Sequence, residues 1–110
     1  MEKFVKGDVV VIPFPFSDLS NTKRRPALVA ANIKGDDLIL CQITSYKKRD
    51  MYSINLKEED ITKGKLDISS SIRPNRLFTA DKSIIEYTLG SLTKTKIKEV
   101  ENKLVDMFLR

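Results

Sequence analysis

Short apolar runs separated by turn signals make up most of this chain, and they restrict it to short strands. Residues 9–12 are β-branched throughout, and a second apolar run covers residues 27–31. The Lys-Gly-Asp-Asp sequence at residues 34–37 is typical of a turn, and residues 38–43 supply a third strand, so we expect a hairpin here. Short strands at short spacing predict a small antiparallel β architecture.

Several features predict interruptions between these strands. Pro13 and Pro15 have no backbone N–H to donate, so we expect the first strand to end at residue 12. Residues 17–25 and 57–65 are polar and predict exposed loops. Pro74 predicts a break between two short strands on either side of it.

The last segment of the chain changes period. Its apolar residues recur at steps of three and four, with charged residues between them: Ile97, Val100, Leu104, Met107 and Phe108. Thr93 stands where an N-cap belongs, so we predict a helix from about residue 94 to the chain end. The complete pattern predicts one domain over residues 1–110, a mainly β fold in which a small antiparallel barrel carries a C-terminal α-helix.

Histidine is absent from the 110 residues, and Cys41 is the single cysteine. The absence of histidine excludes Ser-His-Asp triads and imidazole metal ligands. One cysteine excludes a disulfide framework and a multi-thiolate zinc site, and is typical of a reducing cytoplasm. With 20 Lys and Arg against 15 Asp and Glu, the net charge of +5 fits a polyanionic partner, or solubility alone.

A membrane location is not expected. No stretch approaches the ~18 consecutive apolar residues that a spanning helix needs. The N-terminus also lacks the pattern of a secretory signal peptide. We therefore expect a cytoplasmic protein.

Three groups of residues follow one another along the chain in a recognisable order. The first runs from Gly-Asp at residues 7–8 to Arg-Pro-Ala-Leu-Val at residues 25–29, and the second is Gln-Ile-Thr-Ser at residues 42–45. The third is Leu-Phe-Thr-Ala-Asp-Lys-Ser at residues 77–83, followed by Gly-Ser-Leu at residues 90–92. Together they resemble the MazF/PemK-type toxins of bacterial toxin–antitoxin pairs over nearly the whole chain.

This resemblance implies a fold, an activity and partners. The fold is an SH3-like antiparallel β-barrel with a C-terminal α-helix, assembled as a homodimer. The activity is that of a metal-independent, cofactor-free endoribonuclease that cuts single-stranded RNA at short motifs. The second partner is a cognate antitoxin, which wraps the toxin with an extended acidic segment, and a chain of charge +5 complements it.

The resemblance also implies a catalytic pair, Arg25 and Thr44. A guanidinium binds two phosphate oxygens at once, and a hydroxyl donates one hydrogen bond to such an oxygen. Both therefore suit stabilisation of a pentacoordinate phosphate. Without histidine the general base stays open between Asp18, our candidate, and Arg25 itself after losing its proton.

Further residues are candidates for RNA contacts, because cations follow a phosphate backbone and aromatic rings stack on unpaired bases. They are Phe16, Lys23, Arg24, Ser45, Lys47, Lys48, Arg49, Arg73 and Arg76. Phe14 and Phe16 flank Pro15, and packing in the core or in a dimer interface is the alternative role for both rings.

Two other functions remain as alternatives. One is a toxin of the same fold that grips DNA gyrase and cuts nothing. The other is an RNA-binding module without catalysis, which would keep the basic face and lose the catalytic pair. The Arg-Pro and Ile-Thr-Ser sequences favour the ribonuclease, because neither alternative needs them.

Overall fold

The structure is a computed structural model that describes residues 3–15, 22–45, 50–66 and 69–110. The described chain forms seven strands and one α-helix. They are β1 (Asp8–Pro15), β2 (Thr22–Asn32), β3 (Asp37–Thr44), β4 (Ile54–Leu56), β5 (Ile61–Gly64), β6 (Ser70–Asp81), β7 (Tyr87–Leu92) and α1 (Lys94–Phe108). Two short 3₁₀ turns, η1 (Glu58–Asp60) and η2 (Lys82–Ile84), precede β5 and β7.

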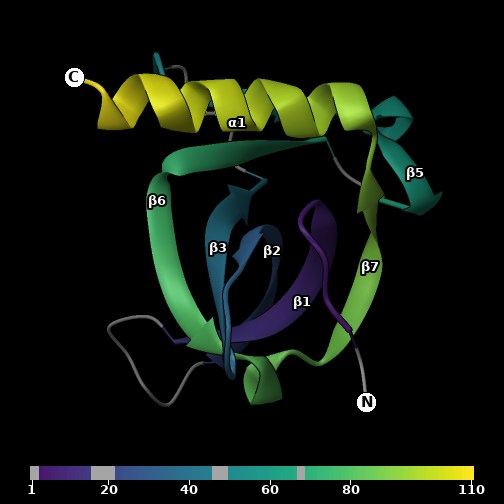
Figure 1. Cartoon of the computed structure of the whole chain (residues 1–110). Coiled ribbons are helices and arrows are strands. Elements are labelled where there is room, and N and C mark those ends of the chain that lie inside the picture. The colour runs from purple at the N-terminus through teal and green to yellow at the C-terminus, as the bar shows by residue number, and fades with distance from the viewer. Residues whose placement is uncertain (1–2, 16–21, 46–49, 67–68) are drawn as a thin grey trace.

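The strands form one antiparallel sheet in the order β4-β6-β3-β2-β1-β7-β5. The sheet curls into a half-barrel, and α1 lies across it next to the first part of β6 (Figure 1). Strand β5 stands at the outer edge, beside β7 (Figure 1). This confirms the expected mainly β, SH3-like antiparallel barrel with a C-terminal α-helix.

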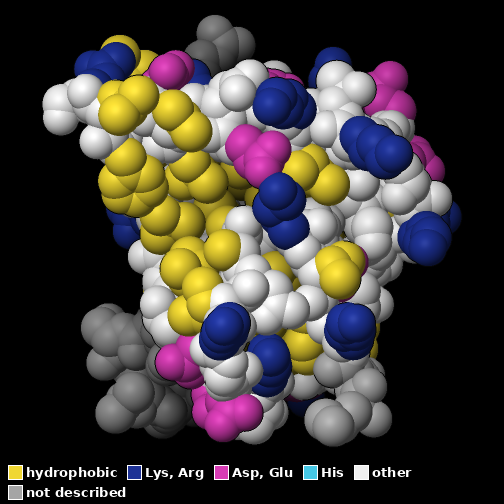
Figure 2. All heavy atoms as spheres, in the orientation of Figure 1, with side chains coloured by type: hydrophobic (Ala, Val, Ile, Leu, Met, Phe, Trp, Pro, Cys, Tyr) yellow, Lys and Arg dark blue, Asp and Glu magenta, His cyan; other side chains and the backbone are white. Residues whose placement is uncertain are grey.

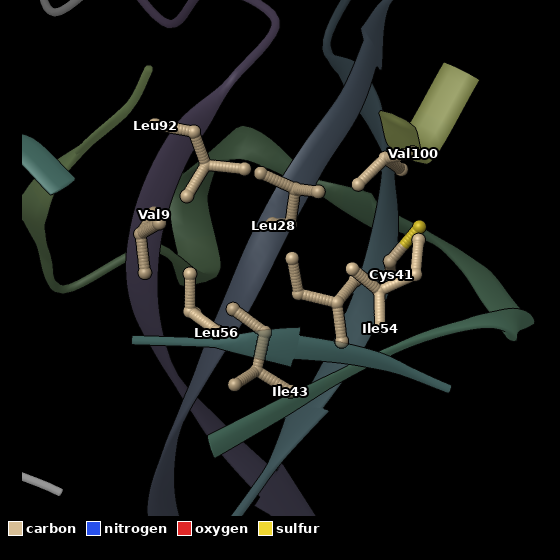
Figure 3. Packing of buried hydrophobic residues seen from close by; sticks show 9 residues of the cluster. Val9, Leu28, Cys41, Ile43, Ile54, Leu56, Leu92 and Val100 are labelled. Atoms are coloured by element: carbon tan, nitrogen blue, oxygen red, sulfur yellow. The ribbon is translucent and has the colours of Figure 1, made fainter. Parts of the chain in front are cut away.

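Both faces of the central strands carry hydrophobic clusters, because successive side chains of a strand point to opposite faces. Val9 and Leu28 belong to one cluster, which Val100 of α1 completes (Figure 3). Val10 and Ala27 belong to the other, which also contains Phe4. Both clusters therefore fix β1 against β2, the strand that carries Arg25.

Helix α1 confirms the periodicity of the last segment. The side chain of Thr93 caps the helix by accepting a hydrogen bond from the backbone N–H of Lys96 at 3.2 Å. Val100 is buried, and the helix ends at Phe108, two residues before the chain end. Among the helices of the described residues, none has the length and hydrophobicity needed to cross a membrane.

Strand β1 continues through the two prolines that we expected to end it. Pro13 pairs with Arg24 and Pro15 with Thr22 of β2. Pro13 and Pro15 are two and four residues after Val11, so their backbone polar groups point to the same side of β1 as those of Val11. The carbonyl of Val11 accepts a hydrogen bond from the N–H of Glu86, so this is the side of β7. Strand β7 reaches only as far as Val11 along β1, so the missing proline N–H groups face the side that β7 leaves open.

Two further expectations are corrected. The polar segment 57–65 is not only loop, since it contains η1 and the edge strand β5. Strand β6 runs through Pro74 because the sheet absorbs the extra residues as a bulge. Consecutive residues Cys41 and Gln42 of β3 pair with Leu77 and Arg73, so residues 74–76 are left out of the ladder.

Candidate active site

The expected catalytic residues lie on neighbouring strands. Arg25 is in β2 and Thr44 is the last residue of β3, and these strands pair with Ala27 opposite Gln42. Arg25 and Thr44 each stand two residues beyond this pair along their own strands. Because side chains alternate, both residues lie on the sheet face that carries Ala27 and Gln42.

The cations before Arg25 belong to a strand, whereas we expected a loop up to residue 25. Strand β2 begins at Thr22, and both Lys23 and Arg24 are exposed. The Nε of Arg24 donates to Oε1 of Glu86. This hydrogen bond and the negative charge of Glu86 raise the pKa of Arg24. The backbone pairing of β2 with β1 holds residues 22–25 in an extended conformation.

A pocket of about 360 Å³ opens beside Arg25. Cations line part of it, namely Lys23, Arg24, Arg25 and Lys65. Apolar side chains supply much of the rest, namely Val11, Pro26, Ile43, Leu66 and Leu89, and Ser45, Ser70 and Tyr87 complete it. No carboxylate occurs among these described lining residues, so the pocket suits an anionic ligand with an apolar part.

Arg73 has a different environment from the other candidate cations. Its side chain is only 8% exposed, and its Nη2 donates to Oδ2 of Asp50 at 2.7 Å. Although desolvation opposes the effect, hydrogen bonds from the N–H groups of Tyr52 and Ser53 lower the pKa of Asp50. This placement favours a structural role in which Arg73 anchors the turn before β4.

Arg76 is exposed on the bulge of β6. It lines a shallow hollow of about 480 Å³ together with Gln42, Asn75, Leu77 and Phe78. Gln42 shares its sheet face with Thr44, two residues further along β3. Arg76 is therefore close to the candidate pair along the sheet, but in a separate hollow from the pocket beside Arg25.

The remaining candidates lie outside the described residues: Phe16, Asp18, Lys47, Lys48 and Arg49. Of the expected site, the structure brings together Lys23, Arg24, Arg25 and Ser45 at one pocket.

Among the pocket residues that were not candidates from the sequence, Lys65 and Tyr87 carry polar groups that could contact a ligand. Lys65 follows the edge strand β5, and Tyr87 begins β7, where it pairs with Val11. Neither carries a motif, and an isolated Lys or Tyr in a polar segment is unremarkable. Only the pairing of strands that are far apart in sequence brings them to Arg25.

Comparison with known families decides what kind of protein this is. The model of the PemK-like, MazF-like toxins of type II toxin–antitoxin systems matches residues 5–108. The chain belongs to this toxin family. No curated protein sequence matches the chain.

Solved structures share the fold of this family member. MazF from Deinococcus radiodurans matches with a TM-score of 0.77 and 20% identity, covering 100% of each chain. An endoribonuclease from a mycobacterial species matches with a TM-score of 0.73 and 15% identity, covering 96% of this chain and 91% of its own. A mycobacterial endoribonuclease in complex with its cognate antitoxin gives 0.74 and 15%, covering 94% and 93%.

Proposed function

We propose that this toxin is an endoribonuclease of the mRNA interferase type, which cleaves single-stranded RNA at short sequence motifs without a metal ion. The observation that carries the proposal is the shared sheet face of Arg25, in the first half of β2, and Thr44, the last residue of the neighbouring β3. The cation-lined pocket next to Arg25 supports it, because RNA presents both phosphates and unpaired bases. Relatives of the same fold include endoribonucleases.

In the proposed reaction the 2′-oxygen bonds to phosphorus while the bond from phosphorus to the 5′-oxygen breaks. The products carry a 2′,3′-cyclic phosphate and a 5′-hydroxyl. Arg25 binds phosphate oxygens and stabilises the charge that builds up on the pentacoordinate phosphate. Thr44 donates a hydrogen bond to the same phosphate. Asp18 stays our candidate for the base that accepts the 2′-hydroxyl proton, and the 5′-oxygen takes up a proton as it leaves.

A cognate antitoxin and a second copy of the chain are the proposed partners, in the cytoplasm. A related mycobacterial enzyme is known in complex with its antitoxin, and the charge of +5 suits an acidic inhibitory segment. Hydrophobic side chains gather at the C-terminal end of α1 and beside β6 (Figure 2), where Val105, Phe108 and Leu109 are exposed. Such a patch supports a homodimer, which sedimentation velocity tests directly.

The test of the proposed activity is incubation of the purified chain with long single-stranded RNA in excess EDTA, followed by mapping of the RNA ends. We expect discrete cuts with 2′,3′-cyclic phosphate and 5′-hydroxyl ends. A strict magnesium requirement would contradict the proposed chemistry. Intact RNA in every sequence context would leave the gyrase-binding toxin or the non-catalytic RNA-binding module as the function.

A further inference from the structure

We infer that the ion pair between Arg24 and Glu86 holds Arg25 in position for RNA cleavage, so that Arg24 and Glu86 are positioning residues. The inference rests on the proposed ribonuclease function and adds to it a contact between β2 and the start of β7. It gives Arg24 a different role from the RNA contact that the sequence predicted.

Arg25 lies in a two-stranded extension of the sheet. Within the described chain, the pairing of β2 with β3 begins at Ala27, and the pairing of β1 with β7 ends at Val11. Beyond these points, residues 22–25 of β2 pair only with residues 12–15 of β1. Two strands without further neighbours are marginally stable in water, so strand pairing alone holds this extension weakly.

The prolines of β1 explain why β7 does not continue along the extension. Pro13 and Pro15 have no N–H groups to donate to a longer β7. The N–H of Glu86 donates to the carbonyl of Val11 at 2.9 Å, at the point where the pairing stops. Strand β1 lies between β2 and β7 (Figure 1), so a side chain of β2 has to cross β1 to reach β7.

Arg24 makes this crossing. It pairs with Pro13 of β1, and its Nε donates to Oε1 of Glu86, the residue before β7. The ion pair therefore joins the extension to β7 where backbone hydrogen bonds cannot. Because Arg24 and Arg25 are adjacent, a contact that holds the first of them also restrains the backbone of the second.

The direction and the pairing of Arg24 both argue against a role in RNA binding. Successive side chains of a strand alternate, so Arg24 points away from the face that Arg25 shares with Thr44. Its charge is already paired with Glu86, so a phosphate has to displace a carboxylate to bind it. Arg24 therefore affects cleavage through Arg25 and contributes little to the affinity for RNA.

Alanine variants of the pair distinguish positioning from RNA binding. A misplacement of about 1 Å can cost up to about 100-fold in rate, so we expect Arg24→Ala and Glu86→Ala each to slow single-turnover cleavage at saturating enzyme by about tenfold. The probe for binding is an RNA that contains the mapped cleavage motif, with a 2′-O-methyl group at the cut nucleotide. Its Kd should stay within about threefold of wild type for both variants, with an unchanged salt dependence.

The double variant tests whether the two residues act through one contact. Arg24→Ala and Glu86→Ala remove the same ion pair, so the protein that carries both changes should cleave no more slowly than either single variant. Rate losses that multiply would show independent roles and contradict the inference.

The ion pair between Lys6 and Glu101 is the matched control. It is also exposed and also joins distant parts of the chain, but neither residue lines the pocket beside Arg25. Lys6→Ala and Glu101→Ala should therefore cleave at the wild-type rate. Exposed ion pairs contribute little to stability, so all of these variants should fold, which circular dichroism at the assay temperature checks.

The outcomes separate the positioning role from the ribonuclease itself. If Arg24→Ala weakens RNA binding and lowers its salt dependence by about one ion, while Glu86→Ala tightens binding and cleaves normally, Arg24 is a phosphate contact and the inference is wrong. If wild type cuts RNA and both variants cut it equally fast, the positioning role is refuted while the proposed function stands. If wild type cuts no RNA at all, the proposed function fails, and the positioning role fails with it.

Discussion

Arg25 and Arg73 lie on the same face of the sheet but in different surroundings. Thr44 pairs with Ser71 and Gln42 with Arg73, so Arg73 lies close to the candidate pair along the sheet. Arg25 lines an open pocket, whereas the guanidinium of Arg73 is buried against Asp50. Both residues are arginines, but the difference in burial makes Arg25 a candidate for substrate contact and Arg73 a candidate structural anchor.

Replacing Arg73 distinguishes the two roles. If Arg73 anchors the turn before β4, Arg73→Ala lowers the melting temperature by several degrees, because it removes the cation that is paired with Asp50. The salt dependence of RNA binding then stays as in wild type. An unchanged melting temperature with a salt slope reduced by about one ion would instead identify Arg73 as a phosphate contact. The exposed Arg76→Ala variant is the comparison, with the reduced slope expected there.

At the scale of elements, local signals predicted some strands and the helix well. The period of α1 and its Thr93 cap lie within one short segment, so the sequence contains everything that decides them. The turn between β2 and β3 is local in the same way. Strand β5 was missed because it is an exposed edge strand whose polar residues show no alternation of burial.

The candidate site likewise has a part that the sequence predicts and a part that it does not. Arg25 and Thr44 followed from a resemblance of ordered motifs, and their common face follows from the register of one hairpin. The pocket could not be predicted in this way, because β1, β7 and the end of β5 contribute to it from distant parts of the sequence. Tyr87 becomes a candidate only when its pairing with Val11 is known.

Strand β5 depends on a glycine that lets it approach β7 closely. Gly64 has φ of +94°, and a Cβ there would lie 1.9 Å from the carbonyl oxygen of Leu89. Gly35, in the β2–β3 turn, has φ of +99°, and a Cβ there would have no described atom within 4 Å. The two positions share a positive φ, which would strain any residue with a Cβ, and they differ in the close contact.

Alanine at these two positions isolates the contact. We expect Gly35→Ala to lower the free energy of unfolding by about 1–2 kcal/mol through left-handed backbone strain. Gly64→Ala should cost about 1–3 kcal/mol more, because β5 has to move away from β7. Urea denaturation measures both. Equal losses would show that the approach of β5 to β7 is not tight.

At the scale of the whole molecule, carboxylates stabilise the fold in their charged form. Hydrogen bonds from Ser83 lower the pKa of Asp81, and a hydrogen bond from Lys6 lowers the pKa of Glu101. The pKa of Asp50 is lowered as well. Each of these groups binds its proton more readily in the unfolded chain, so their contribution is present at neutral pH and is lost in acid.

The free energy of unfolding should therefore fall as the pH drops from about 5 to about 2. Asp81→Asn removes one of the titrating groups and should make this decline less steep. Urea denaturation at a series of pH values measures the slope. Stability that rises on acidification would contradict the direction of these pKa shifts.

The central claim is that Arg25 carries RNA cleavage, and a single-turnover rate on the mapped RNA motif in EDTA tests it most directly. Removal of one preorganised donor typically costs about 10²- to 10³-fold, so we expect at least that loss for Arg25→Ala, with the folded state retained by circular dichroism. Lys34→Ala, far from the pocket, should cleave at the wild-type rate. An Arg25→Ala variant that cleaves as fast as wild type would contradict the account.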